Sequence, residues 1–402
     1  MTEKPALKLK RLQDLTLKGK RVLVRADYNV PMNGSKIADN ARIRETLKTL
    51  EYLLEQNARI VLIAHLGRPK GKPEPKYTLK PVADELGRLL KKPVAFASDC
   101  VGPAADKAVA ALKPSGVLLL ENLRFHAEEE ANDAGFAKAL AQHGTVFIQD
   151  AFGALHRAHA STAGVTRYLP GAIGFLVQRE LEFLDRAMGN PARPFTAIIG
   201  GAKVSDKLAV LDKLLDRVDV LLIGGGMAYT FLAAQGISIG KSLLEKDQIE
   251  AAKAIIERGY NKKVEILLPA DHRAVRGVAP DAVVSVTQAM SIPAELIGVD
   301  IGPHTIEFFV EHIAKSKTVF WNGPMGIFEM DAFAQGSLAV AAAMDEATQA
   351  GAITIVVGGD SLAVIKKAGL VGKMSHCSTG GGASLELLKG NVLPGLAALA
   401  AS

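Results

Sequence analysis

Four arginines stand at comparable places along the first half of the chain. Arg68 and Arg124 follow closely on short apolar runs, Arg157 lies shortly after a third run, and Arg42 opens the first expected helix. A planar guanidinium binds phosphate or carboxylate with two parallel hydrogen bonds. Any one of these residues would be an ordinary solvated arginine. As a set at strand exits, they predict a pocket for a multiply charged anion.

The second half carries glycines at the corresponding places. Pairs or triplets of glycine occupy positions 200–201, 224–226, 358–359 and 380–382. Glycine allows a backbone to approach a ligand closely, and a helix N-terminus offers free N–H groups to phosphate. A single pair usually serves helix–sheet packing, but four clusters in one half predict a cradle for a nucleotide.

Charged residues beside these glycines suggest phosphoryl transfer. Lys203 and Lys207 are four positions apart, so both would face one side of a helix beginning after Gly201. An ammonium group placed there would stabilise a phosphoryl group during transfer. We expect Asp360, beside two glycines, to bind the Mg²⁺ of a nucleotide, and Glu329 to accept a hydrogen bond from a ribose hydroxyl.

The elements that would position these residues are short apolar runs alternating with helical stretches. Runs of this kind, without polar alternation, are typical of strands buried on both faces of a parallel sheet. They predict an α/β fold with two doubly wound parallel-sheet domains, joined by a helix and separated by a cleft that closes by hinge motion. Ligands of such sheets bind beyond the carboxyl ends of the strands. The expected strands are 21–24, 60–64, 117–120, 146–148, 196–199, 220–223, 265–268, 318–321 and 353–357, and the expected helices are 41–56, 79–90, 136–142, 175–188, 208–215 and 246–259.

Composition and charge narrow the class of protein. The 402 residues include two cysteines, Cys100 and Cys377, which excludes a disulfide scaffold and a CxxC motif. Residues 1–190 carry a net charge of +8 and residues 191–402 a net charge of −2. The basic residues are dispersed and aromatic residues are few, which favours a small anionic substrate over nucleic acid.

No apolar signal segment occurs near the start, and residues 220–240 fit a strand, a glycine turn and a helix better than a membrane span. We therefore expect a cytoplasmic protein that binds neither nucleic acid nor membranes.

Several familiar motifs are absent or misleading. The segment 236–242 resembles a phosphate-binding Walker A loop, but its glycines are one residue too close. GxGxxG, HExxH and GxSxG do not occur, which argues against a dinucleotide-binding domain, a zinc protease and a serine hydrolase. Two alternatives to a phosphotransferase remain open from the residues alone: a nicotinamide-dependent dehydrogenase and a non-catalytic two-domain protein that binds anions.

Taken together, the motifs resemble the phosphoglycerate kinase family over nearly the whole chain. The motifs that resemble the phosphoglycerate site of that family are 25–31, 65–68, 120–125 and 156–159. Those that resemble its nucleotide site are 200–207, 321–326, 358–361 and 380–384. The resemblance implies reversible phosphoryl transfer from the acyl phosphate of 1,3-bisphosphoglycerate to MgADP, which gives 3-phosphoglycerate and ATP in glycolysis or gluconeogenesis.

The resemblance also implies roles for single residues and boundaries for domains. Phosphoglycerate would be held by Asp27, Asn29, Arg42, His65, Arg68, Arg124 and Arg157. The nucleotide would be held by Lys207, Gly298, Glu329, Gly358, Gly359, Asp360 and Ser361, with Asp360 near Mg²⁺ and with Lys207, Arg42 and Lys203 as the catalytic residues. We expect a monomer with a phosphoglycerate domain at 1–173, a joining helix at 174–190, a nucleotide domain at 191–384 and a final segment, 385–402, packed on the first domain.

Overall fold

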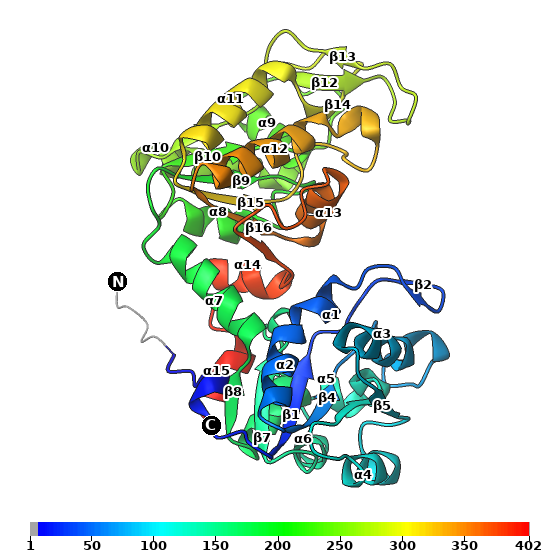
Figure 1. Cartoon of the computed structure of the whole chain (residues 1–402). Helices are drawn as coiled ribbons and strands as arrows, with labels where there is room; N and C mark the ends of the chain where they lie inside the picture. Colours follow the sequence, from blue (N-terminus) through cyan, green and yellow to red (C-terminus); the bar gives the residue numbers. More distant parts are fainter. Residues whose placement is uncertain (1–6, 402) are drawn as a thin grey trace. The chain divides into compact units, whose positions relative to one another are not determined.

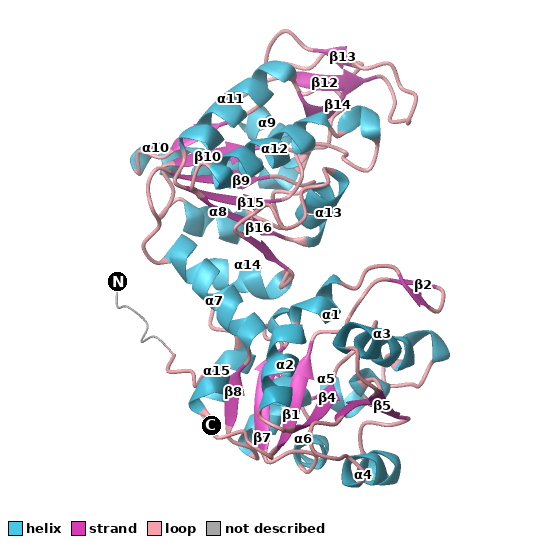
Figure 2. Ribbon diagram, viewed as in Figure 1, coloured by secondary structure: helices cyan, strands magenta, loops and turns pink. Residues whose placement is uncertain are grey.

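The computed structural model describes residues 7–401 and divides the chain into two compact units. The N-terminal unit runs to Glu182 and also takes in the last segment, from Asn391. The C-terminal unit is the intervening stretch, Phe183–Gly390. Each unit has its own sheet flanked by helices (Figures 1 and 2).

The N-terminal unit is built on a six-stranded sheet in which every strand pairs in parallel with its neighbours. In spatial order its strands are β5 (Val94–Ala97), β6 (Val117–Leu120), β4 (Arg59–Ile63), β1 (Arg21–Ala26), β7 (Val146–Asp150) and β8 (Gly171–Ile173). At the centre Val24 lies opposite Leu62 on one side and Ile148 on the other, and all three are fully buried. Burying each of them contributes about 1.5–3 kcal/mol relative to exposure.

Helices and short turns connect these strands and cover the sheet. The helices are α1 (Ala41–Glu45), α2 (Leu47–Glu55), α3 (Lys80–Leu90), α4 (Gly102–Ala110), α5 (Ala127–Glu130), α6 (Ala134–Ala141) and α15 (Pro394–Ala400). Short helical turns include η1 (Leu12–Asp14), η2 (Pro75–Tyr77), η3 (Leu123–Phe125), η4 (Phe152–Ala154), η5 (Ala160–Gly164) and η6 (Val165–Arg167), and β2 (Met32–Asn33) pairs with β3 (Lys36–Ile37) in a hairpin. The last helix, α15, lies beside β8: Leu399 fills the space beside Gly171, and Gly395 donates its N–H to the carbonyl oxygen of Leu155 at 3.1 Å (Figure 1).

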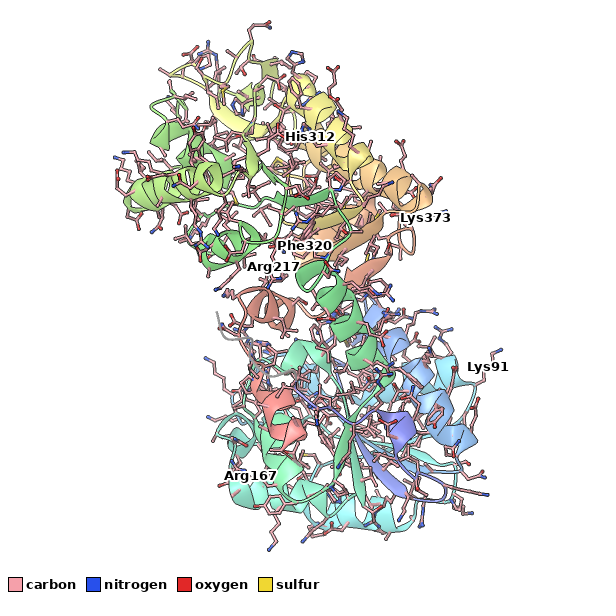
Figure 3. All side chains as sticks on the ribbon, turned by 90° about the vertical axis from the view of Figure 1, so that its left-hand side faces the viewer. Lys91, Arg167, Arg217, His312, Phe320 and Lys373 are labelled. Carbon is pink, nitrogen blue, oxygen red and sulfur yellow. The ribbon has the colours of Figure 1, made fainter. Side chains whose placement is uncertain are left out.

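The C-terminal unit repeats the parallel arrangement and adds a small antiparallel sheet. Its main sheet has the order β11 (Glu265–Leu267), β10 (Val220–Ile223), β9 (Phe195–Ile199), β15 (Thr318–Asn322), β16 (Ile353–Val357) and β17 (His376–Ser378). The small sheet has the order β13 (Ser285–Val286), β12 (His272–Val275) and β14 (Ile297–Ile301). The helices are α8 (Leu208–Leu214), α9 (Met227–Ala234), α10 (Ile249–Asn261), which follows the turn η7 (Lys246–Gln248), α11 (Pro303–Lys315), α12 (Gln335–Gln349), which follows the turn η8 (Asp331–Phe333), α13 (Gly359–Lys367) and α14 (Gly382–Leu388). Phe320 of β15 lies inside this unit, and Lys373 lies at its surface, as Lys91 does in the N-terminal unit (Figure 3).

The predicted α/β class with two parallel sheets is confirmed, and the predicted strands form within a residue or two of the expected positions. Three edge strands (β5, β8 and β17) and the small antiparallel sheet were missed. Their runs are only two to five residues long, and β5 is only partly buried. The helix predicted for 41–56 is wrong as one element: it breaks at Thr46, whose buried hydroxyl donates to the carbonyl of Ile43.

The units divide within helix α7 (Phe175–Met188) rather than at its ends. Its first turn is tied to the N-terminal unit, because Phe175 donates its N–H to Thr49 and Leu176 donates to Asp150. Further along, Phe183 stacks on His376 of the C-terminal unit at a centroid distance of 4.6 Å. Breaks were expected at 173/174, 190/191 and 384/385; the compact units divide at 182/183 and 390/391.

Among the described residues, no helix is long and apolar enough to cross a membrane. Within 220–240, β10 is followed by a glycine turn and the buried helix α9.

Candidate active site

The carboxyl edge of the N-terminal sheet places a histidine against a buried arginine. Arg25, near the end of β1, and His65, just beyond β4, are both buried, and Arg25 Nη2 lies 2.9 Å from His65 Nδ1. A guanidinium can only donate, so Nδ1 must accept this hydrogen bond. The proton of a neutral His65 ring is therefore on Nε2, which is left free to donate to an anion.

Four arginines act on this histidine. Burial lowers the pKa of His65 well below its usual range, and the charges of Arg25, Arg124, Arg42 and Arg157 lower it further. The pKa of the nearby His159 is lowered to about 4, first by burial and then by three of the same arginines. Three of the four predicted arginines thus converge here. The fourth, Arg68, follows on the same loop as His65 and is exposed.

Polar side chains hold the loop that carries His65 and Arg68. Asn29 Oδ1 accepts the N–H of Gly67 at 2.9 Å, and Arg124 Nη1 donates to the carbonyl oxygen of Gly67 at 2.7 Å. Asp27 forms an ion pair with Arg42, joining Oδ2 to Nη1 at 2.6 Å. Asp27 Oδ1 also accepts the N–H of Asn29 at 3.3 Å. The structure therefore brings together Asp27, Asn29, Arg42, His65 and Arg124, all of which were predicted for one site.

The carboxyl edge of the C-terminal sheet is organised around a lysine and an asparagine. Lys207 Nζ donates to Asn322 Oδ1 at the end of β15, and Asn322 Nδ2 donates to the carbonyl oxygen of Val357 at 2.7 Å. Ser361, in the first turn of α13, is fully buried and accepts the N–H of Gly323 at 2.7 Å. Burial lowers the pKa of Lys207, while the charges of Asp206 and Asp360 act in the opposite direction. The predicted Lys207 and the segment from Gly358 to Ser361 are thus joined through Asn322.

The expectation that Lys203 and Lys207 share one face of a helix is wrong, because α8 begins only at Leu208. Glu245 holds the preceding segment out of the helix: its carboxylate accepts the N–H groups of Val204 and Ser205 and the hydroxyl of Ser205. Lys203 is consequently exposed on a turn, while Lys207 is half-buried at the helix start.

The glycine clusters of this unit fall into two groups. A Cβ placed on Gly200 would lie 2.2 Å from the carbonyl oxygen of Pro324, and one on Gly225 would lie 2.6 Å from the backbone nitrogen of Gly201. Such glycines let loops at neighbouring strand ends pack against one another, so their role is packing and not contact with a ligand. By contrast, a Cβ on Gly359 or Gly381 would meet nothing within 4 Å. Only this second group leaves backbone open to a ligand.

The other residues expected around a nucleotide are placed as follows. Asp360 is exposed in the first turn of α13, within electrostatic range of Lys207. Gly298 lies on β14, where its N–H is donated to Ser242 Oγ at 2.9 Å and where Tyr229 leaves no room for a side chain. Glu329 is exposed beyond β15. Mg²⁺ commonly binds through one or two carboxylates together with substrate phosphates, so the exposed carboxylate of Asp360 fits such an ion.

Comparisons with known proteins agree with this arrangement. The sequence model described as phosphoglycerate kinase matches residues 12–391. The phosphoglycerate kinase of Elusimicrobium minutum is 55% identical over 393 residues, which cover 98% of each chain. The chain belongs to the phosphoglycerate kinase family.

Solved structures of the family have the same fold. The phosphoglycerate kinase of Coxiella burnetii superposes with a TM-score of 0.88 at 41% identity and covers 98% of this chain and 99% of its own. That of Pyrococcus horikoshii superposes with a TM-score of 0.85 at 33% identity, covering 97% of this chain and 98% of its own. Phosphoglycerate kinases are phosphotransferases, so the dehydrogenase and the non-catalytic anion-binding protein are both set aside.

Three residues that organise the phosphoglycerate kinase site were not among the predicted site residues. Arg25 Nε donates to Ser161 Oγ at 2.8 Å, and Ser161 in turn donates its hydroxyl and its N–H to the buried carboxylate of Glu129. Burial raises the pKa of Glu129, whereas Arg25 lowers it. Arg25 stands in the quoted motif 25–31 and was available as a signal. Ser161 and Glu129 carry no sequence signal, because their role depends on tertiary contacts across 32 positions between each other and 136 positions between Ser161 and Arg25.

Proposed function

We propose that the N-terminal unit binds phosphoglycerate and the C-terminal unit binds the adenine nucleotide. The observation that carries this assignment is the grouping of arginines at one edge of the sheet: Arg25 contacts the buried His65, Arg124 donates to the loop that carries His65, and Arg42 pairs with Asp27. A three-carbon acid phosphate carries a carboxylate and a phosphate, which match a group of guanidinium donors. Asp27, Asn29, Arg42, His65, Arg68, Arg124 and Arg157 would hold it, with neutral His65 donating from Nε2.

In the second unit, open backbone and one ammonium group take the place of the arginines. Gly358, Gly359, Asp360 and Ser361 lie at the start of α13, where free N–H groups and the helix dipole favour phosphate. Lys207 would lie against the transferring phosphoryl group, and Gly298 and Glu329 would bind the nucleoside. Asp360 would hold Mg²⁺, which neutralises phosphate oxygens when it is bound.

The chemistry needs no general base in the direction that consumes ATP. The attacking group is the carboxylate of 3-phosphoglycerate, which is ionised at neutral pH. An oxygen of that carboxylate forms the new bond to the γ-phosphorus as the bond from this phosphorus to the β-bridging oxygen breaks, so that ADP leaves. Catalysis then rests on alignment and on neutralising charge, for which we propose Lys207 and Arg42, with Lys203 in a lesser role.

Transfer also requires the donor and acceptor atoms to lie in line, although their proposed binding residues belong to different units. We propose that binding of both substrates draws the units together by a hinge motion that excludes water from the acyl phosphate. Small-angle scattering would then give a smaller radius of gyration only with both substrates present. We also propose that the enzyme acts as a cytoplasmic monomer, which sedimentation tests for its oligomeric state.

The deciding experiment is steady-state turnover of 3-phosphoglycerate with MgATP, coupled to NADH oxidation through glyceraldehyde-3-phosphate dehydrogenase. Saturable activity that requires both substrates and is lost with EDTA is the expected result. To test the assignment of units, Arg124→Ala should raise the Michaelis constant for 3-phosphoglycerate and leave that for ATP unchanged. An equal change in both constants would contradict the assignment.

A further inference from the structure

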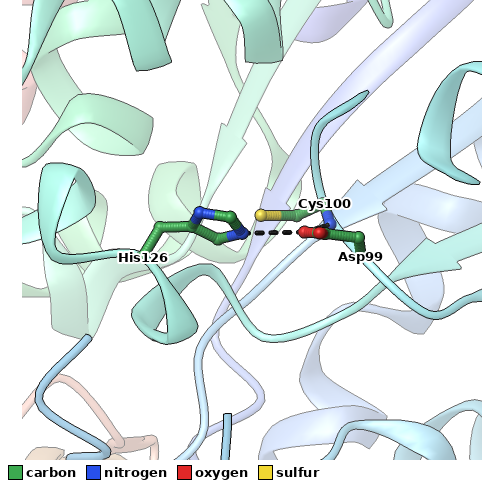
Figure 4. A group of neighbouring side chains, drawn as sticks. All are labelled: Asp99, Cys100 and His126. Atoms are coloured by element: carbon green, nitrogen blue, oxygen red, sulfur yellow. Dashed lines mark hydrogen bonds and ion pairs between the residues drawn. The ribbon is translucent and has the colours of Figure 1, made fainter. Parts of the chain in front are cut away.

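Away from the residues assigned above, three different metal-ligating side chains meet in the N-terminal unit. Asp99 and Cys100 lie one residue beyond the end of β5, and His126 follows η3. One donor atom from each of the three lies within 4.8 Å of the other two (Figure 4). Among residues 7–401 no other group of three such side chains comes this close.

The thiol is buried and has no partner. Cys100 is fully buried, and no other residue between 7 and 401 forms a hydrogen bond with its sulfur. In Figure 4 the sulfur lies beside the imidazole ring of His126 and the carboxylate of Asp99. A free buried cysteine usually packs as a small apolar residue, but this one lies beside two further metal-ligating groups.

Neighbouring contacts hold all three groups in place. His126 Nε2 lies 2.7 Å from Asp99 Oδ1, which also accepts the N–H of Cys100 at 2.7 Å. The carbonyl oxygen of Cys100 lies 3.1 Å from His143 Nε2, and the His126 ring packs against Phe136 at a centroid distance of 5.2 Å. The contacts from His143 and Phe136 come from outside the three side chains, as do the contacts that orient the ligands of metal sites.

We propose that Asp99, Cys100 and His126 form a binding site for a divalent transition-metal cation, with Zn²⁺ as the best match. Thiolate and imidazole ligands select Zn²⁺ over Mg²⁺, which requires oxygen ligands. Three protein ligands and one solvent molecule complete its tetrahedral coordination. Zinc holds its ligand atoms roughly 3–4 Å apart, so small side-chain movements suffice. The side chains of Asp99 and His126 are 43% and 27% exposed, which gives the ion a path from solvent.

Cobalt provides the test, because Co²⁺ replaces Zn²⁺ and gives a thiolate-to-cobalt charge-transfer band when sulfur is a ligand. The full-length enzyme would be freed of metal with EDTA, dialysed, and titrated with Co²⁺ in the presence of excess Mg²⁺ and without nucleotide. We expect a band that saturates at one equivalent and disappears when Zn²⁺ is added. Absence of the band, or saturation only at many equivalents, would overturn the proposal.

Variants identify the ligands. Cys100→Ser should remove the band, and the matched variant Cys377→Ser should retain it, since Cys377 is the other cysteine of the chain. If Cys100→Ser fails to fold, His126→Asn and Asp99→Asn decide, because both side chains are partly exposed. Each should weaken Zn²⁺ binding about 100-fold or more in calorimetry. Unchanged Zn²⁺ affinity in both variants would show that the cluster is only an ion pair beside a core cysteine.

Discussion

The two units carry different chemical groups at the carboxyl edge of similar sheets. In the N-terminal unit, arginine and histidine side chains from the ends of β1, β4 and β6 are joined by buried hydrogen bonds. In the C-terminal unit, some glycines let neighbouring loops pack closely, others such as Gly359 leave backbone open, and Lys207 lies at the same edge, bonded to Asn322.

This difference teaches that charge and backbone access place different demands on a fold. A buried cation must be given hydrogen-bond partners and a counter-charge, because desolvating it is costly. A backbone surface needs no counter-charge, but it needs glycine wherever two loops touch. Substitutions should therefore damage the two units in different ways, and the predictions below are arranged from the largest expected effect to the smallest.

The largest effect is expected where the counter-charge of the N-terminal unit is removed. Glu129→Gln leaves the buried Arg25 without the buried counter-charge that it reaches through Ser161, which should destabilise the protein by about 3–5 kcal/mol. Denaturant unfolding measures this loss. The neighbouring Glu128 is exposed, so Glu128→Gln is the matched control and should change stability by less than about 0.5 kcal/mol. Equal effects in the two variants would remove the distinction drawn for this unit.

Lys207, the half-buried cation beside Asn322 in the C-terminal unit, should matter for rate more than for stability. Lys207→Ala should lower kcat by about 10²–10³-fold with little change in ADP affinity, because its charge is needed where charge develops in the transition state. The exposed Lys203 serves as the comparison, and Lys203→Ala should lower kcat by about tenfold or less. A reversed order of the two lysines in stopped-flow turnover would contradict their placement.

Substituting two glycines of the C-terminal unit separates the cost of close contact between loops from the cost of a strained backbone conformation. Gly323 has φ +99°, and a Cβ there would lie 2.2 Å from the carbonyl oxygen of Gly200. Gly351 has a similar φ of +92° but open space around it. Gly323→Ala should cost about 3 kcal/mol from strain and overpacking, and Gly351→Ala about 1 kcal/mol from strain alone. Urea unfolding that gives the same cost for both would show that loop contact is unimportant.

Each unit contains a buried aspartate with a raised pKa, and substituting these aspartates should give the smallest effects. Burial raises the pKa of Asp150 in the first unit and of Asp300 in the second to about 7. Both pKa values are raised in the folded state, so the protonated carboxyl groups stabilise the fold. This stabilisation is complete below a pH of about 4 and is lost as the pH rises through 7. Asp150→Asn and Asp300→Asn should each flatten the decline in unfolding free energy between pH 5 and 8 by about 2 kcal/mol. A variant as pH-sensitive as the parent would exclude that carboxyl group as a source of the decline.

Particular residues show how far prediction from sequence could go. The central strands were predictable because fully buried runs such as 220–223 have only one environment in a parallel sheet. Edge strands such as Gly171–Ile173 were missed, since a run of only three residues gives no periodic signal. The sequence singled out the glycine clusters but did not distinguish Gly200, which packs against Pro324, from Gly359, which is open.

By itself, the sequence determined the order of the central strands and of the main helices between them, the concentration of arginines in one half and of glycines in the other, and the family. Those properties are local, because they depend on residue type and on spacing along the chain. Only the tertiary structure decided that Arg25 meets His65 and Ser161, that Lys203 stands apart from Lys207, and that Cys100 faces His126. Such meetings depend on which strands become neighbours, and neighbouring strands such as β1 and β7 are separated by more than 100 residues of chain.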